Sequence, residues 1–248
     1  LAHQSRLPTD VTAIPSFGLV QDDAPGSVTD KRYLWASELL ALPPEVSDGS
    51  FLYSNAGYIV VGAMMESITG AAWEDLMAGN VFGPLGMTET GFGAPGTPGQ
   101  VDEPWGHWFE NGGFTPVSPG PGADNPMAIG PAGTVHGTLD DLAKYMLAHI
   151  DGERGIPGLL TADTYRFLHA PFGGYPYGMG WNVDDTEADE IGNTLQHGGS
   201  NDRWFARFAL APGIEVGLLI VTNAGGPVAD SAIDELGDMM IDRVRDSL

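Results

Sequence analysis

Strand-like sequence is concentrated in the last third of this chain, and this order limits the folds that the chain can adopt. Three strand-like runs stand there, "YGMGWNVDD" from residue 177, "RWFARFALAP" from residue 203 and "EVGLLIVTNA" from residue 215. Gly213 lies in the tight link between the second run and the third, which predicts an antiparallel hairpin. The sheet is therefore expected late in the sequence.

Helical patterns dominate the earlier part. Residues 55–69, "NAGYIVVGAMMESIT", are predicted to form a helix that ends at Gly70. Its expected apolar face consists of Ala56, Ile59, Val60, Ala63, Met64 and Ile68. A second helix is predicted over residues 71–82, with Gly83 and Pro84 as its end.

A third helix is predicted over residues 138–150, "TLDDLAKYMLAHI". Thr138 is its expected N-cap, and Asp141 follows at the spacing of a capping box, with Asp in place of the usual Glu. Between the second and third helices, residues 91–133 are dense in Gly and Pro and are expected to be irregular. The aromatic residues Trp105, Trp108 and Phe114 indicate that this segment packs on the rest of the protein, where it is a plausible wall of a pocket.

The last segment, residues 228–248, combines a helical apolar pattern with a stripe of acids. The expected buried face consists of Ala229, Ile233, Leu236, Met240 and Val244. Aspartates recur at strict four-residue spacing, at Asp230, Asp234, Asp238, Asp242 and Asp246. Each such pair of like charges costs about 0.2–0.5 kcal/mol at low salt. Two explanations stay open, adaptation to a salty environment and an ordinary acidic protein of a mesophile.

Together these patterns predict one α/β domain over residues 1–248. Residues 1–170 form a mainly helical region that includes the long 91–133 loop, and residues 175–248 form the closing antiparallel strands with the C-terminal helix packed on them.

Composition excludes several classes of protein. With 33 acidic against 10 basic residues, the net charge is −23, so neither nucleic acid nor an anionic membrane surface is an expected partner. The chain has no Cys, which rules out disulfides, thiolate catalysis and Cys-ligated zinc. No apolar run approaches the roughly 18 residues that a membrane span needs. The compartment stays open.

Three common motifs can be set aside. "GFGAPG" at residues 91–96 has the spacing of a dinucleotide-binding loop, but no strand precedes it and no helix follows. The six His residues show no metal-ligand spacing, so no metal is expected. A G-x-S-x-G nucleophile elbow is absent.

Two short motifs remain as carriers of chemistry. "YSN" places Tyr53 two residues before Asn55 at the start of the first predicted helix, where a tyrosine is more often a packing or capping residue. "HGGSN" leads into the hairpin, and its glycines leave an uncrowded strand edge that a ligand can approach. Backbone N–H groups on such an edge can stabilise an oxyanion, although a Gly pair before a strand is more often only a turn.

In their order along the chain, these pieces resemble the class C β-lactamase-like serine hydrolases, which include penicillin-binding proteins, D-aminopeptidases and carboxylesterases. "HQSRLP" is similar to the "HTSGLP" segment of that family, with Arg6 in place of its glycine. "YSNAGY", "VFGPLGM", "YGMGW" and "HGGSN" resemble four later landmarks, and the match spans nearly all 248 residues.

The resemblance implies a role for each residue of the two motifs. Tyr53 corresponds to the general base or proton shuttle, and Asn55 to the residue that binds the substrate and the catalytic lysine. The residues that stand where other members have Lys-Thr-Gly and an oxyanion donor are His197, Gly198, Gly199 and Ser200. A tyrosine base needs nearby cations, because free tyrosine titrates near pH 10.

One departure from the family is central. The family's nucleophile belongs to a Ser-x-x-Lys motif, yet Val28 stands three places before Lys31, and Asp141 three places before Lys144. We therefore expect this chain to be a C-terminal portion of the domain that lacks the nucleophile segment and the start of the sheet. The chain alone is expected to be inactive.

The resemblance implies a serine hydrolase that cleaves an ester or amide through an acyl-enzyme, without a cofactor. The partner is a small-molecule or peptide substrate, and a groove left by the missing segment is a further expected place of association. β-Lactam, D-amino-acid peptide and carboxylester stay open, with His197 in place of Lys favouring an esterase or peptidase. The alternative is a non-catalytic binding or scaffold protein on the same fold.

Overall fold

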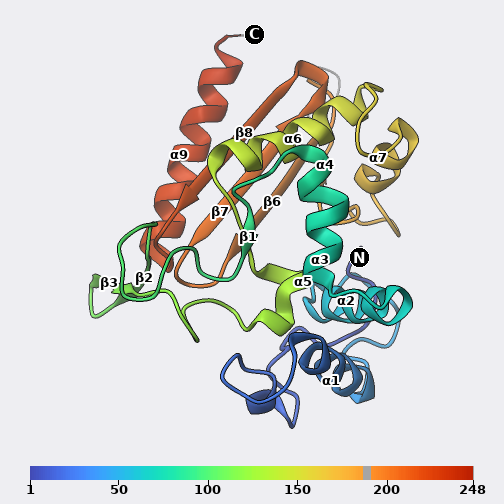
Figure 1. Ribbon diagram of the computed structural model, residues 1–248. Helices are drawn as coiled ribbons and strands as arrows, with labels where there is room; N and C mark the ends of the chain where they lie inside the picture. The colour runs from blue at the N-terminus through green and yellow to red at the C-terminus, as the bar shows by residue number, and fades with distance from the viewer. Residues whose placement is uncertain (187–190, 248) are drawn as a thin grey trace.

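The computed structural model describes residues 1–186 and 191–247, and its strands all pair antiparallel (Figure 1). The larger sheet has the order β5-β6-β7-β8 and consists of β5 (Asn182–Asp184), β6 (Thr194–Ser200), β7 (Phe205–Ala211) and β8 (Val216–Thr222). Two small sheets pair β1 (Gly91–Phe92) with β4 (Val135–His136) and β2 (Gly106–Glu110) with β3 (Gly113–Val117).

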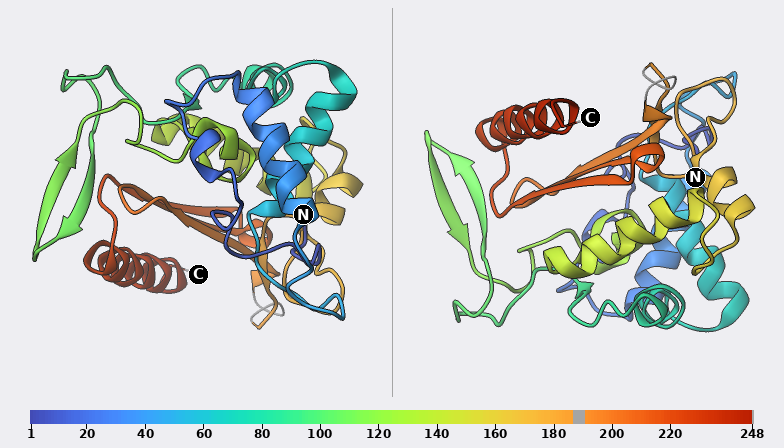
Figure 2. Two further views of the ribbon diagram at one scale, coloured as in Figure 1. Left: turned by 90° about the horizontal axis from the view of Figure 1, so that it is seen from below. Right: turned by 90° about the horizontal axis from the view of Figure 1, so that it is seen from above.

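Most helices precede the large sheet and one, α9, follows it, and together they cover both of its faces. The α-helices of the described residues are α1 (Val28–Ala41), α2 (Ala56–Thr69), α3 (Trp73–Met77), α4 (Gly83–Leu85), α5 (Gly130–Gly133), α6 (Leu139–Glu153), α7 (Ala162–His169) and α9 (Pro227–Arg245). Short 3-10 turns lie at η1 (Phe17–Leu19), η3 (Met127–Ile129) and η4 (Pro212–Ile214). Figure 2 shows α9 on one face of the sheet and α6 on the other. The predicted α/β fold class is confirmed, while the predicted domain boundaries stay a prediction.

The hairpin around Gly213 forms as predicted. Strands β7 and β8 pair along their whole length, from Phe205 opposite Thr222 to Ala211 opposite Val216. A Cβ on Gly213 would lie 2.3 Å from the carbonyl oxygen of Ile191, so no larger residue fits this turn without backbone movement.

Helix α2 also forms as predicted and ends at Gly70, which is left-handed with φ 73°. Its buried face is rotated from the expected one, because Met64 is 55% exposed and Ile68 is 80% exposed. The helix instead turns Gly62 and Glu66 inward with Ala56, Ile59 and Ala63. Because Gly62 has no side chain, Pro131 of α5 packs so closely against it that an added Cβ would lie 2.3 Å from the proline ring. This contact explains why the side of α2 that carries Gly62 faces α5.

The predicted end of the second helix is wrong. The helical path continues from α3 through a π-helical turn (Ala78–Phe82) into α4, and it ends at Gly86, with φ 67°. Pro84 does not stop it, because it occupies the first turn of α4, where a missing N–H costs nothing.

Thr138 caps α6 as predicted, since its hydroxyl oxygen accepts from the backbone N–H of Asp141. The reciprocal half of the capping box is not formed. The Asp141 carboxylate is buried and accepts from the Glu89 backbone N–H, at 2.7 Å, and from the Thr90 hydroxyl, at 3.0 Å. It therefore ties α6 to the segment before β1 and pairs with Lys144 at 2.7 Å.

The expectation of irregular chain across residues 91–133 is wrong for the β2–β3 hairpin. Asn111 and Gly112 form its turn, with φ values of 52° and 79°. Two positive φ angles are what a type I′ hairpin turn requires, and Asn-Gly is its strongest sequence signal. Helices α1 and α7 were not predicted either, although each has a capping side chain, Ser27 and Thr161.

The C-terminal helix forms as α9, but its buried face differs from the predicted one. Leu236 is 45% exposed, and Gly237 is buried in its place with Ala229 and Ile233. An added Cβ at Gly237 would lie 3.3 Å from the Arg207 guanidinium of β7. The acid stripe is partly neutralised as well, because Asp234 pairs with Arg207 at 2.7 Å.

A buried ion cluster joins the first helices. Arg32 of α1 has no exposed surface, and its guanidinium pairs with Glu66 of α2 and with Glu74 of α3. The same guanidinium donates to the backbone carbonyls of Ala128, at 3.1 Å, and Met127, at 3.0 Å. One side chain therefore connects four segments of the helical region.

A second buried polar cluster joins α6 to α7. The ring nitrogens of His149 and His169 lie 2.8 Å apart, and the other nitrogen of His169 lies 2.7 Å from the Glu153 carboxylate. Because the carboxylate only accepts, His169 donates to it and accepts from His149. Burial lowers the pKa of His149 to about 3, and it lowers the pKa of His169 as well.

Stability should therefore fall on mild acidification. Between its unfolded pKa near 6.5 and its folded pKa of about 3, His149 takes up a proton only when the chain unfolds. The free energy of unfolding then falls by up to about 1.4 kcal/mol per pH unit for this proton. Urea unfolding at pH 7 and pH 5 measures the loss, which we expect to be smaller in His149→Gln. An equal loss in the variant would contradict this assignment.

Candidate active site

Tyr53 and His197, which are 144 residues apart, come together where the segment before α2 meets strand β6. Their ring centroids are 6.3 Å apart. The Tyr53 ring also stacks on His3, with centroids 4.1 Å apart, and 45% of Tyr53 is exposed. A tyrosine that is held from one side by a buried ring and open to solvent on the other can meet a bound molecule.

The strand edge next to His197 is open. Strand β5 pairs only with Thr194, Leu195 and Gln196 of β6, whereas β7 pairs with β6 as far as Ser200. Gly198, Gly199 and Ser200 are all exposed. Within the described residues, this part of β6 therefore has a strand partner on one side only, and its other side is free to bind an extended ligand.

Asn55 stands at the start of α2, two residues after Tyr53. Its backbone carbonyl accepts from Tyr58 and Ile59 and so opens the helix. In the part of the chain that the structure describes, its side chain makes no hydrogen bond.

Electrostatics keep both rings of the pair uncharged. Burial raises the pKa of the Tyr53 hydroxyl. Burial also lowers the pKa of His197, and a hydrogen bond with the Gly198 backbone opposes it only in part. At neutral pH the pair is thus a phenol and a neutral imidazole.

The serines closest to the pair are held in other hydrogen bonds. Ser54 is buried and donates its hydroxyl to the Pro8 carbonyl. Ser200 accepts from the Asp202 backbone N–H at 3.1 Å, and Ser5 accepts from the Leu7 N–H at 3.3 Å.

Sequence reasoning missed two residues of this site, His3 and Tyr177. Both lie inside segments that the resemblance singled out, "HQSRLP" and "YGMGW", so the signal was present without a role for either ring. In the structure the Tyr177 hydroxyl lies 3.2 Å from His3 Nε2 and 3.1 Å from His197 Nε2.

Two kinds of feature are absent from the described residues. Among the described residues, no three His, Cys, Asp or Glu side chains cluster as ligands for a metal ion. No helix in that same part of the chain has the length and apolarity to cross a membrane.

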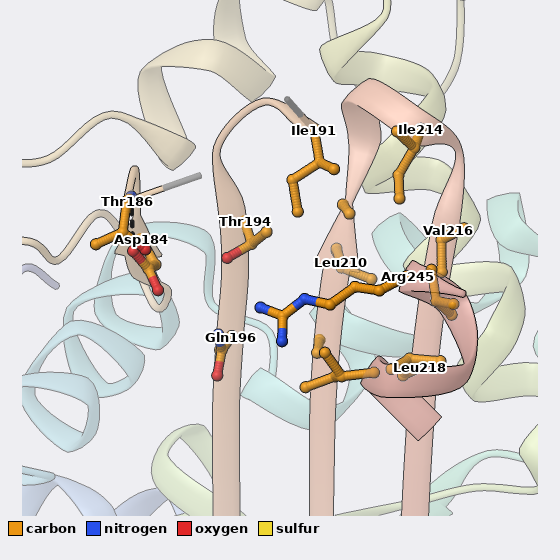
Figure 3. Close-up of a pocket in the computed structure, with 14 residues that line it drawn as sticks. Asp184, Thr186, Ile191, Thr194, Gln196, Leu210, Ile214, Val216, Leu218 and Arg245 are labelled. Carbon is orange, nitrogen blue, oxygen red and sulfur yellow. Dashed lines mark hydrogen bonds between the residues drawn. The ribbon is translucent and has the colours of Figure 1, made fainter. Parts of the chain in front are cut away.

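A further pocket lies away from Tyr53 and His197, on the face of the sheet that α9 covers (Figure 3). Leu210, Ile214, Val216 and Leu218 form much of its wall, and Arg245 reaches across it. We place the candidate active site at Tyr53 and His197 because the acid–base side chains and the open strand edge meet there.

The helical region and the antiparallel sheet form a β-lactamase-like fold. The profile of the Beta-lactamase family matches residues 1–238. The chain belongs to the Beta-lactamase family.

Relatives with assigned names share about a quarter of their residues with this chain. Penicillin-binding protein 4 of Amycolatopsis lactamdurans is 26% identical over 201 residues, which are 74% of this chain and 49% of that protein. Unguisins hydrolase ungD' of Aspergillus campestris is 26% identical over 235 residues, which are 90% of this chain and 41% of that protein. The chain thus spans about half the length of these relatives, or less.

Solved structures share the fold. D-amino acid amidase from Ochrobactrum anthropi SV3, complexed with L-phenylalanine amide, aligns with a TM-score of 0.70 at 20% identity, over 100% of this chain and 71% of that one. The octameric penicillin-binding protein homologue from Pyrococcus abyssi aligns with a TM-score of 0.67 at 21% identity, over 97% of this chain and 54% of that one.

Proposed function

We propose that this chain carries the proton-transfer and substrate-binding part of a serine hydrolase that cleaves an ester or amide through an acyl-enzyme. The observation that carries the proposal is that the rings of Tyr53 and His197 lie close together, with centroids 6.3 Å apart, beside the exposed Gly198–Ser200 edge. The fold supports it, because a D-amino acid amidase and a hydrolase with promiscuous acyltransferase activity are similar to this chain in structure.

In the proposed reaction a serine oxygen attacks the substrate carbonyl, and the carbonyl oxygen becomes an oxyanion. Backbone N–H groups of the β6 edge, with Ser200 as one donor, stabilise that oxyanion. Tyr53 passes the serine proton to the leaving alkoxide or amine, and water then hydrolyses the acyl-enzyme. Asn55, whose side chain makes no other hydrogen bond in the described residues, binds the substrate amide or ester.

The reaction needs a serine and a lysine that these 248 residues do not place as Ser-x-x-Lys. We accordingly propose that the chain alone is inactive. Burial of Tyr53 supports this, because the hydroxyl pKa is raised rather than lowered, and a phenolate base requires a neighbouring cation.

The substrate class that fits is an uncharged ester or amide. A neutral His197 at the binding edge offers a hydrogen-bond donor rather than a cation, so it gives little attraction to the carboxylate of a penicillin. D-amino-acid amides and carboxylesters are therefore favoured over β-lactams.

The second candidate is a non-catalytic binding protein on the same fold. It is favoured by the hydrogen bond of Ser54, whose buried hydroxyl donates to the Pro8 carbonyl and is therefore not free to attack a substrate. The open β6 edge would then hold a peptide without cleaving it.

One experiment separates these functions. The 248-residue chain and the complete product of its gene are each treated with a fluorophosphonate, then assayed with D-phenylalanine amide, a nitrophenyl ester and a chromogenic cephalosporin. We expect labelling and hydrolysis of the amide or ester only in the complete product. No labelling of either protein would favour the binding function. Labelling of the 248-residue chain at a resident serine such as Ser54 would overturn the proposed roles.

A further inference from the structure

A series of hydrogen bonds leads from the backbone just before α2 to His197, through two buried side chains. It begins at Ser54, whose backbone N–H lies 3.0 Å from Nδ1 of His3. A backbone N–H can only donate, so Nδ1 of His3 accepts and carries no proton. Burial lowers the pKa of His3 to about 4, so at neutral pH the ring has a single proton, and that proton is on Nε2.

The next link is Tyr177, which is 2% exposed. His3 Nε2 lies 3.2 Å from the Tyr177 hydroxyl oxygen, and the protonated nitrogen donates to it. Burial raises the pKa of Tyr177, so the hydroxyl keeps its own proton. That proton can be donated to His197 Nε2, which lies 3.1 Å from the hydroxyl oxygen.

The direction of these hydrogen bonds determines which ring nitrogen of His197 carries the proton. If Tyr177 donates to Nε2, the neutral imidazole of His197 carries its proton on Nδ1.

We propose that His3 and Tyr177 are positioning residues that hold His197 in the Nδ1-protonated tautomer next to Tyr53. The catalytic consequence rests on the proposed function, whereas the tautomer itself does not. With its ring fixed in this way, His197 presents an N–H donor at the start of the exposed Gly198–Ser200 edge, and it does so without a positive charge. The arrangement suits a substrate whose group at this position is a neutral acceptor, such as the carbonyl of an amide or ester.

A competing arrangement has a different proton pattern. The Tyr58 hydroxyl donates to the Leu1 carbonyl at 2.9 Å. It also forms a side-chain hydrogen bond with Tyr177, so its oxygen is a second acceptor for the Tyr177 proton. In that case Tyr177 would donate to Tyr58 and would accept from His197, which would then carry its proton on Nε2.

The test is the tautomer of His197, read in the 248-residue protein by nitrogen-15 long-range correlation NMR at neutral pH. We expect the proton on Nδ1 of His197 and on Nε2 of His3. In Tyr177→Phe, the donor to His197 is lost, and we expect the His197 ring to shift toward the Nε2-protonated form. Tyr175→Phe is the matched control, because Tyr175 contacts Phe51 from the same loop and has no hydrogen bond to a histidine.

Each outcome is decisive. A wild-type His197 with its proton on Nε2 would overturn the proposal, even if the Tyr177 variant fails to fold. An unchanged His197 spectrum in a folded Tyr177→Phe protein would overturn it as well. Loss of the proposed function is a separate result, because it would appear as an absence of hydrolysis in the complete gene product while the tautomer remained as expected.

Discussion

In a catalytically complete form of this protein, Tyr53→Phe is expected to lower kcat by roughly 10²-fold or more, because a positioned proton-transfer group contributes about 10²–10⁴-fold. The substitution removes only the hydroxyl. The phenyl ring can keep its stacking on His3, where the centroids are 4.1 Å apart, so folding and KM should change little. Steady-state kinetics with the best ester or amide substrate and circular dichroism of both proteins make the comparison.

Tyr33→Phe is the control for this measurement. Tyr33 lies on α1 and is 65% exposed, so the loss of its hydroxyl should leave kcat unchanged. Wild-type turnover in Tyr53→Phe would reduce Tyr53 to a packing residue, the ordinary role of a tyrosine before a helix.

Replacement of Arg32 by Met should cost about 3–5 kcal/mol of folding free energy, as expected when one partner of a buried ion pair is removed. Arg32 has no exposed surface, and its loss would leave the Glu66 and Glu74 carboxylates without their cation. One Glu66 oxygen already has no hydrogen-bond partner among the described residues, so little remains to compensate for its charge. The midpoint of urea unfolding at neutral pH measures the loss.

Arg166→Met provides the matched comparison. Arg166 pairs with Asp163 at 3.4 Å on the surface of α7, and such exposed pairs contribute about 1 kcal/mol or less. If the two variants lost equal stability, the buried cluster would be no more important for folding than a surface pair.

Local signals in the sequence predicted much of the fold. Gly70 and Thr138 marked helix ends that the structure confirms, and Gly213 marked the β7–β8 turn. These predictions succeed because each depends on one residue and its near neighbours, through a positive φ, a capping hydroxyl or a position without room for a Cβ. The Asn111-Gly112 turn depends on an equally local signal, because both of its residues have a positive φ and Asn-Gly favours it.

Other features could not be read from local patterns. Apolar periodicity placed Leu236, Met64 and Ile68 on buried faces, yet all three are exposed. The helices rotate because glycines at positions 62 and 237 allow closer contact with Pro131 and Arg207 than larger side chains would. Which stripe of a helix is buried therefore depends on the partner surface, which the helix sequence does not contain.

For the candidate site too, some features follow from the sequence and others only from the tertiary structure. The sequence by itself predicted that Tyr53, Asn55 and the 197–200 segment carry the chemistry, because their residue types and order resemble a family. Only the tertiary structure decided that His3 and Tyr177 stand between Ser54 and His197, and that burial leaves the rings neutral. Hydrogen-bond direction and pKa depend on distances between atoms that lie as many as 174 residues apart, and those distances exist only once the chain has packed.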